Sequence, residues 1–285
     1  GFSHIHEWTM AGLLMMPTTG PLQVEVGDQY QPDAGYRARA DTTREEARIG
    51  YYRTFLTDSG IDVELTATTR AGFQRYTFPE TTQARVLLDF QFPAEYRFDL
   101  VSLDVRQSSA TRIEGSVEHH APDVWGRDAQ QEYVLHFVAE FDRPIHASGV
   151  WTDAGVQRDT RVLRTGRVKD AGVYVEFDTR GARTVQVRTG ISLVSLDNAN
   201  LNLRHEISLP FGWDFAAIVD HQRATWNELL GRIRIETPDR REKIRFYTNL
   251  YRSFCRNIWS DVDGRWRDPA ERIQQLNDPD AVMLG

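Results

Sequence analysis

The chain has 285 residues, 40% of them hydrophobic and 11% aromatic, which is enough for a packed core in one large or two ordinary domains. Its 34 basic and 41 acidic residues give a formal charge of -7 with no basic block, which argues against nucleic acid as a partner. No apolar run approaches the roughly 18 residues of a membrane helix, so no membrane span is expected. The single cysteine, Cys255, lies in an apolar helical pattern and is predicted to be buried.

Neither end of the sequence reads as a natural terminus. It starts at Gly1 without an initiator methionine or a signal-like segment, and it stops inside the apolar run Ala281–Gly285. We therefore interpret the chain as part of a longer polypeptide. The residues themselves do not indicate its compartment.

The first two thirds of the chain has the pattern of antiparallel strands. An apolar segment ends in the turn Pro17–Gly20, residues 27–46 are polar and predict a surface loop, and Ile61–Ala67 alternates apolar with polar residues, as a strand with one wet face does. So many half-polar strands without intervening helices favour a mainly β fold, a large antiparallel β-sandwich, over a βαβ fold. The further strands are predicted at residues 72–78, 85–92, 98–105, 111–118, 132–141, 161–164, 173–177 and 185–194.

Near residue 208 the pattern changes to helices. Asp197 or Asn198 is predicted to cap a short helix, and Asp214 to cap a longer one that ends at Gly231. A second long helix is predicted to start at Thr237, and residues 260–267 to form the loop that leaves it. Its apolar stripe comprises Ile244, Tyr247, Leu250, Tyr251, Phe254 and Ile258.

Three residues near the start could serve a binding site. His4 and His6 project from the same face of a strand, which suits a metal or a sugar hydroxyl, but an H-x-H pair supplies only half of a tetrahedral metal site. We therefore predict a structural role or one at the edge of a substrate site, and no metal. Trp8 could stack on the apolar face of a sugar, with a packing role as the alternative.

The segment Ser260–Arg267 holds the other candidates. Asp261 and Asp263 resemble the start of a calcium loop, but Arg265 stands where another oxygen ligand would be needed and no glutamate closes the loop, so an EF-hand is rejected. Two interpretations stay open, a structural Asx-turn and a loop that presents a carboxylate and Arg265 to a polar ligand. Motifs for a nucleophilic serine, a phosphate-binding loop and a zincin are absent from the sequence.

Short motifs in order along nearly the whole chain resemble the start of glycoside hydrolase family 92, the calcium-dependent α-mannosidases. Each motif is short, but the ordered set is specific. The motifs are Gly1–His6, Met16–Gly20, Val63–Thr68, Arg75–Pro79, Gly190–Ser195, Gly212–Phe215, Trp226–Gly231, Phe246–Tyr251 and Ser260–Arg265.

The resemblance implies a β-sandwich (supersandwich), linker helices and the start of an (α/α)6 barrel. We expect these parts at residues 1–208, 209–236 and 237–285, with the site in the cleft between sandwich and barrel. Inverting release of terminal α-linked mannose would use a general acid, a general base and Ca2+, all expected on the barrel beyond Gly285. No catalytic residue and no metal ligand is therefore expected in this chain. His4, His6, Trp8, Asp261, Asp263 and Arg265 would line the α-mannoside site, and the location would be periplasmic or secreted.

Two departures from the family pattern lie near the expected cleft, at Glu7–Met10 and at Asp268–Glu271. They suggest a divergent subgroup of the family. Two alternatives remain open. One is a non-catalytic carbohydrate-binding sandwich protein, and the other is a different glycosidase or phosphorylase that joins a sandwich to a helical barrel. The oligomeric state is not predicted.

Overall fold

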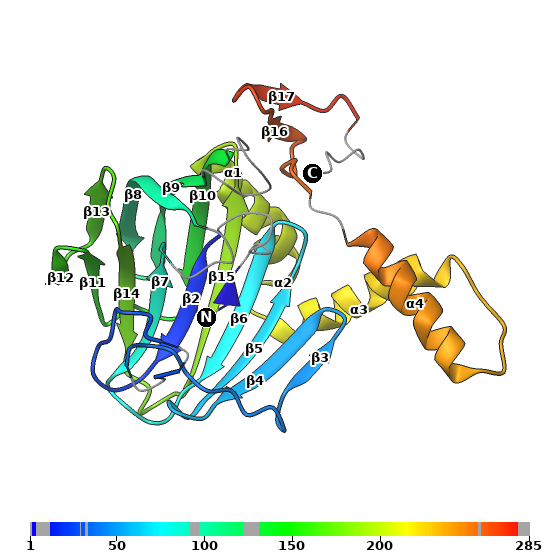
Figure 1. Cartoon of the computed structure of the whole chain (residues 1–285), viewed down its shortest axis with the longest axis horizontal. Coiled ribbons are helices and arrows are strands. Elements are labelled where there is room, and N and C mark those ends of the chain that lie inside the picture. Colours follow the sequence, from blue (N-terminus) through cyan, green and yellow to red (C-terminus); the bar gives the residue numbers. More distant parts are fainter. Residues whose placement is uncertain are drawn as a thin grey trace.

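The computed structural model describes residues 2–3, 12–28, 30–31, 34–91, 97–121, 131–255 and 258–278. Two antiparallel sheets face each other, and helices follow them along the chain (Figure 1). The predicted mainly β fold, a large antiparallel sandwich followed by helices, is confirmed. In the part of the chain that is described, none of the helices is long and apolar enough to cross a membrane.

The smaller sheet has six strands and the larger has nine, and every pairing within them is antiparallel. In spatial order the smaller sheet comprises β1 (Phe2–Ser3), β2 (Leu14–Thr18), β7 (Ala84–Asp89), β14 (Ala171–Phe177), β11 (Ala147–Thr152) and β12 (Gly155–Arg158). The larger comprises β13 (Val162–Thr165), β8 (Asp99–Ser109), β9 (Arg112–Ala121), β10 (Gln131–Phe141), β15 (Thr184–Ser192), β6 (Ala71–Thr77), β5 (Ile61–Ala67), β4 (Tyr51–Leu56) and β3 (Glu46–Arg48).

The main core fills the space between the two sheets. Alternate residues of each strand point into it, as in β10, where Leu135, Phe137 and Ala139 are buried. Apolar burial of this kind contributes about 25 cal/mol per Å² removed from water and is the main force that holds the sheets together. The predicted strands are found with shifts of a few residues at their ends. Sequence reasoning missed β3, β11 and β12.

The polar segment at residues 27–46 is not only a surface loop. Its Tyr36 is 6% exposed, packs with the main core, and donates its hydroxyl hydrogen bond to the carboxylate of Asp89 at the end of β7. Asp89 also accepts a bond from the backbone N–H of Gln91 (2.8 Å). Burial raises the pKa of Asp89 to about 6, although both of these hydrogen bonds lower it.

We expect replacement of Asp89 by asparagine to change how stability depends on pH. Because the folded pKa of about 6 lies above the ordinary value of 3.8, the wild type is stabilised below pH 4 and loses this contribution as pH rises through 6. The melting temperature of Asp89→Asn minus that of the wild type should therefore increase from pH 4.5 to pH 7.5, whatever the difference is at pH 4.5. Parallel pH profiles of the two proteins would contradict a buried, titrating Asp89.

One nearly continuous helical segment crosses the outer face of the nine-stranded sheet. It consists of α1 (Leu196–Leu203), a π-helical turn η1 (Arg204–Ser208) and α2 (Leu209–Phe211), and it ends at Gly212, whose φ is 58°. Pro210 has no N–H to continue the α-helical ladder and its ring crowds the preceding turn, which accounts for the widened turn at η1.

The cap of α1 differs from the prediction. Ser195, not Asp197 or Asn198, is the N-cap, and its hydroxyl accepts a hydrogen bond from the backbone N–H of Asn198 (3.1 Å).

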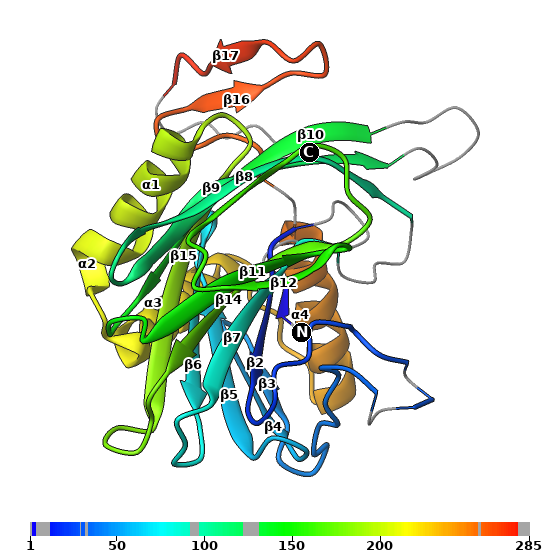
Figure 2. The same cartoon turned by 90° about the vertical axis from the view of Figure 1, so that its left-hand side faces the viewer.

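A glycine lets the helix α1 lie close to the sheet, since a Cβ at Gly190 of β15 would be 2.3 Å from the carbonyl oxygen of Ala199. Figure 2 shows α1, α2 and the start of the next helix on this face.

Two longer helices, α3 (Phe215–Gly231) and α4 (Arg240–Phe254), extend away from the sandwich (Figure 1). Asp214 caps α3 as predicted, but the N-cap of α4 is Asp239 and not Thr237. Only the first turns of α3 pack on the sheet, where Phe215 and Ile218 are buried. A short hairpin of β16 (Arg265–Arg267) and β17 (Ile273–Gln275) follows α4, so part of the predicted loop 260–267 is a strand.

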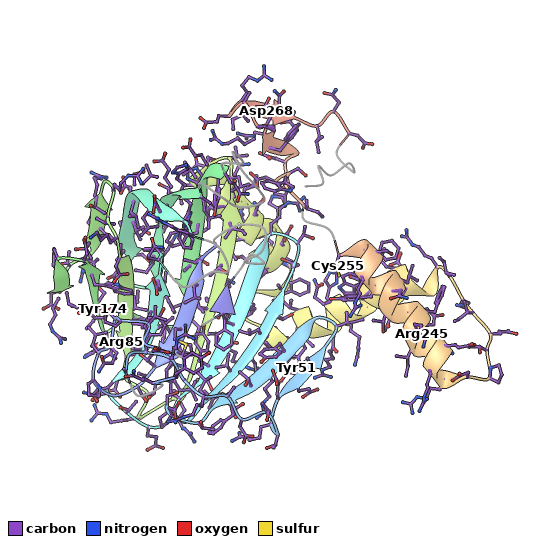
Figure 3. All side chains as sticks on the ribbon, in the orientation of Figure 1. Tyr51, Arg85, Tyr174, Arg245, Cys255 and Asp268 are labelled. Atoms are coloured by element: carbon purple, nitrogen blue, oxygen red, sulfur yellow. The ribbon has the colours of Figure 1, made fainter. Side chains whose placement is uncertain are left out.

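The predicted apolar stripe of α4 is only partly covered, because Tyr247, Leu250 and Tyr251 are half-buried while Ile244 and Phe254 are exposed. None of its residues is buried, and Ile244 and Phe254 are 56% and 42% exposed. Ile258 lies beyond the end of the helix. The prediction of a buried Cys255 is wrong, because its thiol is exposed at the end of α4 (Figure 3). Among the described residues, α4 packs mainly against α3, where Tyr251 contacts Trp226, and this leaves the end of the helix exposed.

Candidate functional site

The loop Ser260–Gly264 is attached to the sandwich where β15 ends and α1 begins. The two side chains of α1 that point at it, Asn198 and Asn202, are four residues apart and so lie on one helix face. Inside the loop, the N–H of Gly264 donates to the carbonyl of Asp261 (2.9 Å), and the N–H of Asp261 donates to the carbonyl of Arg265 (2.8 Å). The loop is thus a closed turn that is held from outside by a helix.

Asp261 is the buried anchor of this loop. It is 5% exposed, and its two carboxylate oxygens accept hydrogen bonds from the Ser192 hydroxyl (2.6 Å) and the Asn202 amide (2.7 Å). Burial raises the pKa of Asp261, while these two bonds oppose the rise. Asn202 is itself fully buried, and it also donates to the carbonyl of Ile191 (2.8 Å) and accepts from the N–H of Val262 (3.0 Å).

Asp263 and Arg265 form the outer part of the loop. The carboxylate of Asp263 accepts the Asn198 amide (3.1 Å to each oxygen) and the Nε of Arg265 (2.8 Å). The backbone N–H of Arg265 also donates to Asp263 (3.1 Å), which makes the predicted Asx-turn. The Arg265 side chain is 49% exposed, so its guanidinium retains donors that face solvent.

A second attachment comes from the turn between β5 and β6. Arg70 donates from Nε to the carbonyl of Ser260 (2.5 Å) and from Nη1 to Glu206 (2.7 Å). Glu206 also accepts the Thr68 hydroxyl (2.6 Å) and the Arg70 backbone N–H (2.7 Å). Because the Arg70 and Glu206 side chains are only 14% and 13% exposed, this ion pair joins the sheet, the helical segment and the loop in a largely dry environment.

The hairpin β16–β17 lies beside the end of the sandwich where α1 starts (Figures 1 and 2). Arg267 in β16 donates to the carbonyls of Leu193 (2.9 Å) and Val194 (3.4 Å). Burial, with a further contribution from the charge of Arg267, lowers the pKa of His136 to about 4, so this imidazole is neutral at pH 7.

Asp268 organises the turn of the hairpin (Figure 3). Its carboxylate accepts the backbone N–H groups of Ala270 and Arg272 (both 2.9 Å), the Arg272 Nε (2.9 Å) and the Gln274 amide (2.8 Å). The bond from the Arg272 backbone is the largest of the effects that lower the pKa of Asp268 to about 2. The segment Asp268–Glu271, where a departure from the family pattern is expected, is thus a compact turn.

Of the six predicted site residues, the structure describes three and brings those three together. His4, His6 and Trp8 lie outside the described residues. Asp261, Asp263 and Arg265 come together, with Asp261 inside the protein and Arg265 at the surface. Within the described ranges, no group of three or more histidine, cysteine, aspartate or glutamate side chains is arranged to hold a metal ion.

Sequence reasoning missed the residues that hold the loop. Two asparagines spaced four apart on one face of a helix were an available signal, since buried asparagine must find partners. Their partners are about 60 residues away in sequence, and the Arg70 bond to the Ser260 carbonyl spans 190 residues. The missed residues are Arg70, Ser192, Asn198, Asn202, Glu206 and Arg267.

Comparisons with known proteins agree with this architecture. The family model described as the glycosyl hydrolase family 92 N-terminal domain matches residues 1–192, and that described as the glycosyl hydrolase family 92 catalytic domain matches residues 198–280. No curated protein matches the chain.

Several solved structures share the fold. A family GH92 α-mannosidase from Bacteroides thetaiotaomicron, BT3965, solved in complex with mannoimidazole, is similar to 93% of this chain at 26% identity and a TM-score of 0.81. Two other GH92 structures are similar to 96% of this chain, each with a TM-score of 0.76. They are the inverting mannosidase BT2199 of the same species, at 17% identity, and the GH92 family glycosyl hydrolase ccman5, at 23% identity. The chain spans about a third of these proteins, 34%, 34% and 36% of their lengths.

Proposed function

Since this chain belongs to glycosyl hydrolase family 92, we propose that the protein of which it is a part releases terminal α-linked mannose from glycans with inversion. The observation that carries the proposal is the similarity over 93% of the chain to a mannosidase solved with mannoimidazole. Because the chain covers 34% of that enzyme, the activity is proposed for the longer protein and not for this part alone.

In this proposal the loop Ser260–Gly264 and the start of β16 form the sandwich side of the sugar site. Asp261 supports the loop from within, while Asp263 and Arg265 face the sugar, together with His4, His6 and Trp8. The exposed guanidinium of Arg265 supports this role, because a cation held by a neighbouring carboxylate is a rigid donor for sugar hydroxyls.

The proposed division of the chain is a sandwich over residues 1–208, a helical linker over 209–236 and the first part of an (α/α)6 barrel over 237–285. The exposed side chains of Ile244 and Phe254 on α4 support it, since exposed apolar surface needs a partner and further barrel helices would supply one. We propose that the general acid, the general base and the calcium ligands belong to that remaining part. Bound calcium would supply a positive charge that orients mannose hydroxyls.

The test is an assay of the full-length protein for mannose release from α-linked mannosides, with and without a calcium chelator. We expect release that falls on chelation and recovers when calcium is returned. Activity that chelation leaves unchanged would contradict the calcium proposal, and no release from any mannoside would contradict the substrate. Fractionation of the source cells tests the proposed periplasmic or secreted location.

A second function is a carbohydrate-binding protein without catalysis. The divergent turn at Asp268–Glu271 favours it, because this turn lies beside the loop that would face the sugar. The two functions are distinguished by the release assay together with a measurement of α-mannan binding. A binding protein would retain α-mannan and release no sugar from it.

A further inference from the structure

A groove lies on the outer face of the nine-stranded sheet, away from the loop Ser260–Gly264. Its volume is about 590 Å³, which is within the usual range for ligand sites. Its floor comes from β5, β6 and β15, and its wall from the Gly212 turn and the start of α3. Six residues of β15 separate Gln186 in the groove from Ser192 beside Asp261, a distance of roughly 20 Å along a strand. The two places are therefore distinct.

The floor is built by cross-strand pairs. Arg75 of β6 is directly opposite both Glu64 of β5 and Gln186 of β15, and in the next row Thr77 of β6 is opposite Thr184 of β15. Residues opposite each other in antiparallel strands share a face, so these five side chains lie side by side on the outer surface. The floor therefore presents amide, hydroxyl and charged groups together.

The charged pair on the floor is fixed and neutral overall. The guanidinium of Arg75 donates to both carboxylate oxygens of Glu64 (2.8 and 2.7 Å), and the Tyr51 hydroxyl adds a third bond (2.9 Å). Burial raises the pKa of Glu64, but these bonds outweigh it and lower the pKa, so the carboxylate stays charged beside its partner. Asp214 adds a negative charge at the rim, which disfavours phosphate or another anion as ligand.

The remaining polar groups are available to a ligand. The side chains of Gln186, Thr77 and Thr184 make no hydrogen bond to any other residue in the described ranges, and all three are half-buried. Half-buried amides and hydroxyls both donate and accept, which matches the hydroxyl groups of a sugar. The wall adds Trp213, a half-buried indole that Arg188 holds from one side at 4.2 Å.

We propose that this groove is a secondary binding site for a neutral oligosaccharide. The proposal rests on the proposed function for the class of ligand, an α-mannose glycan. The groove would hold a branch of that glycan while its terminal residue occupies the site near the loop Ser260–Gly264. The free amide and hydroxyls bind sugar hydroxyls, and Trp213 contacts the apolar C–H groups of the ring.

The test uses the full-length protein and soluble α-mannan in native affinity gels. We expect the double variant Thr184→Ala and Gln186→Ala to bind mannan about tenfold more weakly, the size expected for two lost hydrogen bonds. Its kcat/KM on a small aryl α-mannoside, which does not reach the groove, should be unchanged. Gln157→Ala is the matched control, since Gln157 is an exposed amide on β12 of the other sheet.

The outcomes separate this inference from the proposed function. Equal retardation of the double variant and the wild type would overturn the groove, and so would a wild type that α-mannan does not retard. The wild type could be retarded by α-mannan, the double variant less so, and neither hydrolyse a mannoside. That result would support the groove and contradict the proposed function. A lower kcat/KM of the double variant on the aryl mannoside would contradict the claim that the groove is separate from the site of hydrolysis.

Discussion

Replacement of Asn202 by alanine is expected to lower the free energy of unfolding by about 3 kcal/mol. The amide is fully buried and is the partner of the Asp261 carboxylate, the Ile191 carbonyl and the Val262 N–H, and each polar group that loses its partner costs about 1–3 kcal/mol. The melting temperature should fall by about 5–10 °C. In the full-length protein, kcat/KM for mannose release should fall as well, because the loop loses its anchor.

The matched control is Asn200→Ala on the same helix. Asn200 is exposed, and in the described ranges its side chain makes one hydrogen bond, which it accepts from Arg112 (3.0 Å), so its loss should change the melting temperature by less than about 2 °C. Equal effects of the two substitutions on the melting temperature would contradict a specific role of Asn202 in holding the loop.

Replacement of Arg70 by leucine is expected to have an effect of similar size. Leucine leaves Glu206 in a largely buried position without its cation, and breaking a buried pair of this kind costs about 3–5 kcal/mol. It also removes the donor to the Ser260 carbonyl, so the loop loses its second attachment. We expect a fall of about 5–10 °C in the melting temperature.

The control for Arg70 is an arginine in an exposed ion pair. Arg180 and Asp178 are 65% and 38% exposed, and exposed pairs contribute about 0–1 kcal/mol. Arg180→Leu should therefore melt close to the wild type. If Arg70→Leu also melts close to the wild type, or if high salt abolishes the difference in melting temperature between Arg70→Leu and the wild type, the pair of Arg70 and Glu206 is not the buried link described above.

The strands could be predicted because their signal is local. Core residues alternate with others along the strand, as Ile61 and Val63 do in β5 and Leu135, Phe137 and Ala139 do in β10, and this period is visible in the sequence. The short strand β12 has four exposed residues and so carries no such pattern. Its place is set by pairing with β11, which is a tertiary contact.

The candidate site could be predicted only in part. The motif at Ser260–Arg265 located the loop and its Asx-turn, because both depend on neighbouring residues. Burial of Asp261 depends on Ser192 and Asn202, and no local pattern reports contacts made across 60 residues. The exposure of Cys255 was missed for the same reason, since an apolar helical pattern does not say whether a partner is present.

The most direct test of the account is the kcat/KM for mannose release by the full-length variant Arg265→Ala. The side chain is 49% exposed and anchors no other element in the described ranges, so the melting temperature should stay near that of the wild type. Loss of one charged donor to the sugar predicts a fall of about 10- to 100-fold in kcat/KM. A variant with unchanged kcat/KM would contradict the assignment of this loop to the sugar site.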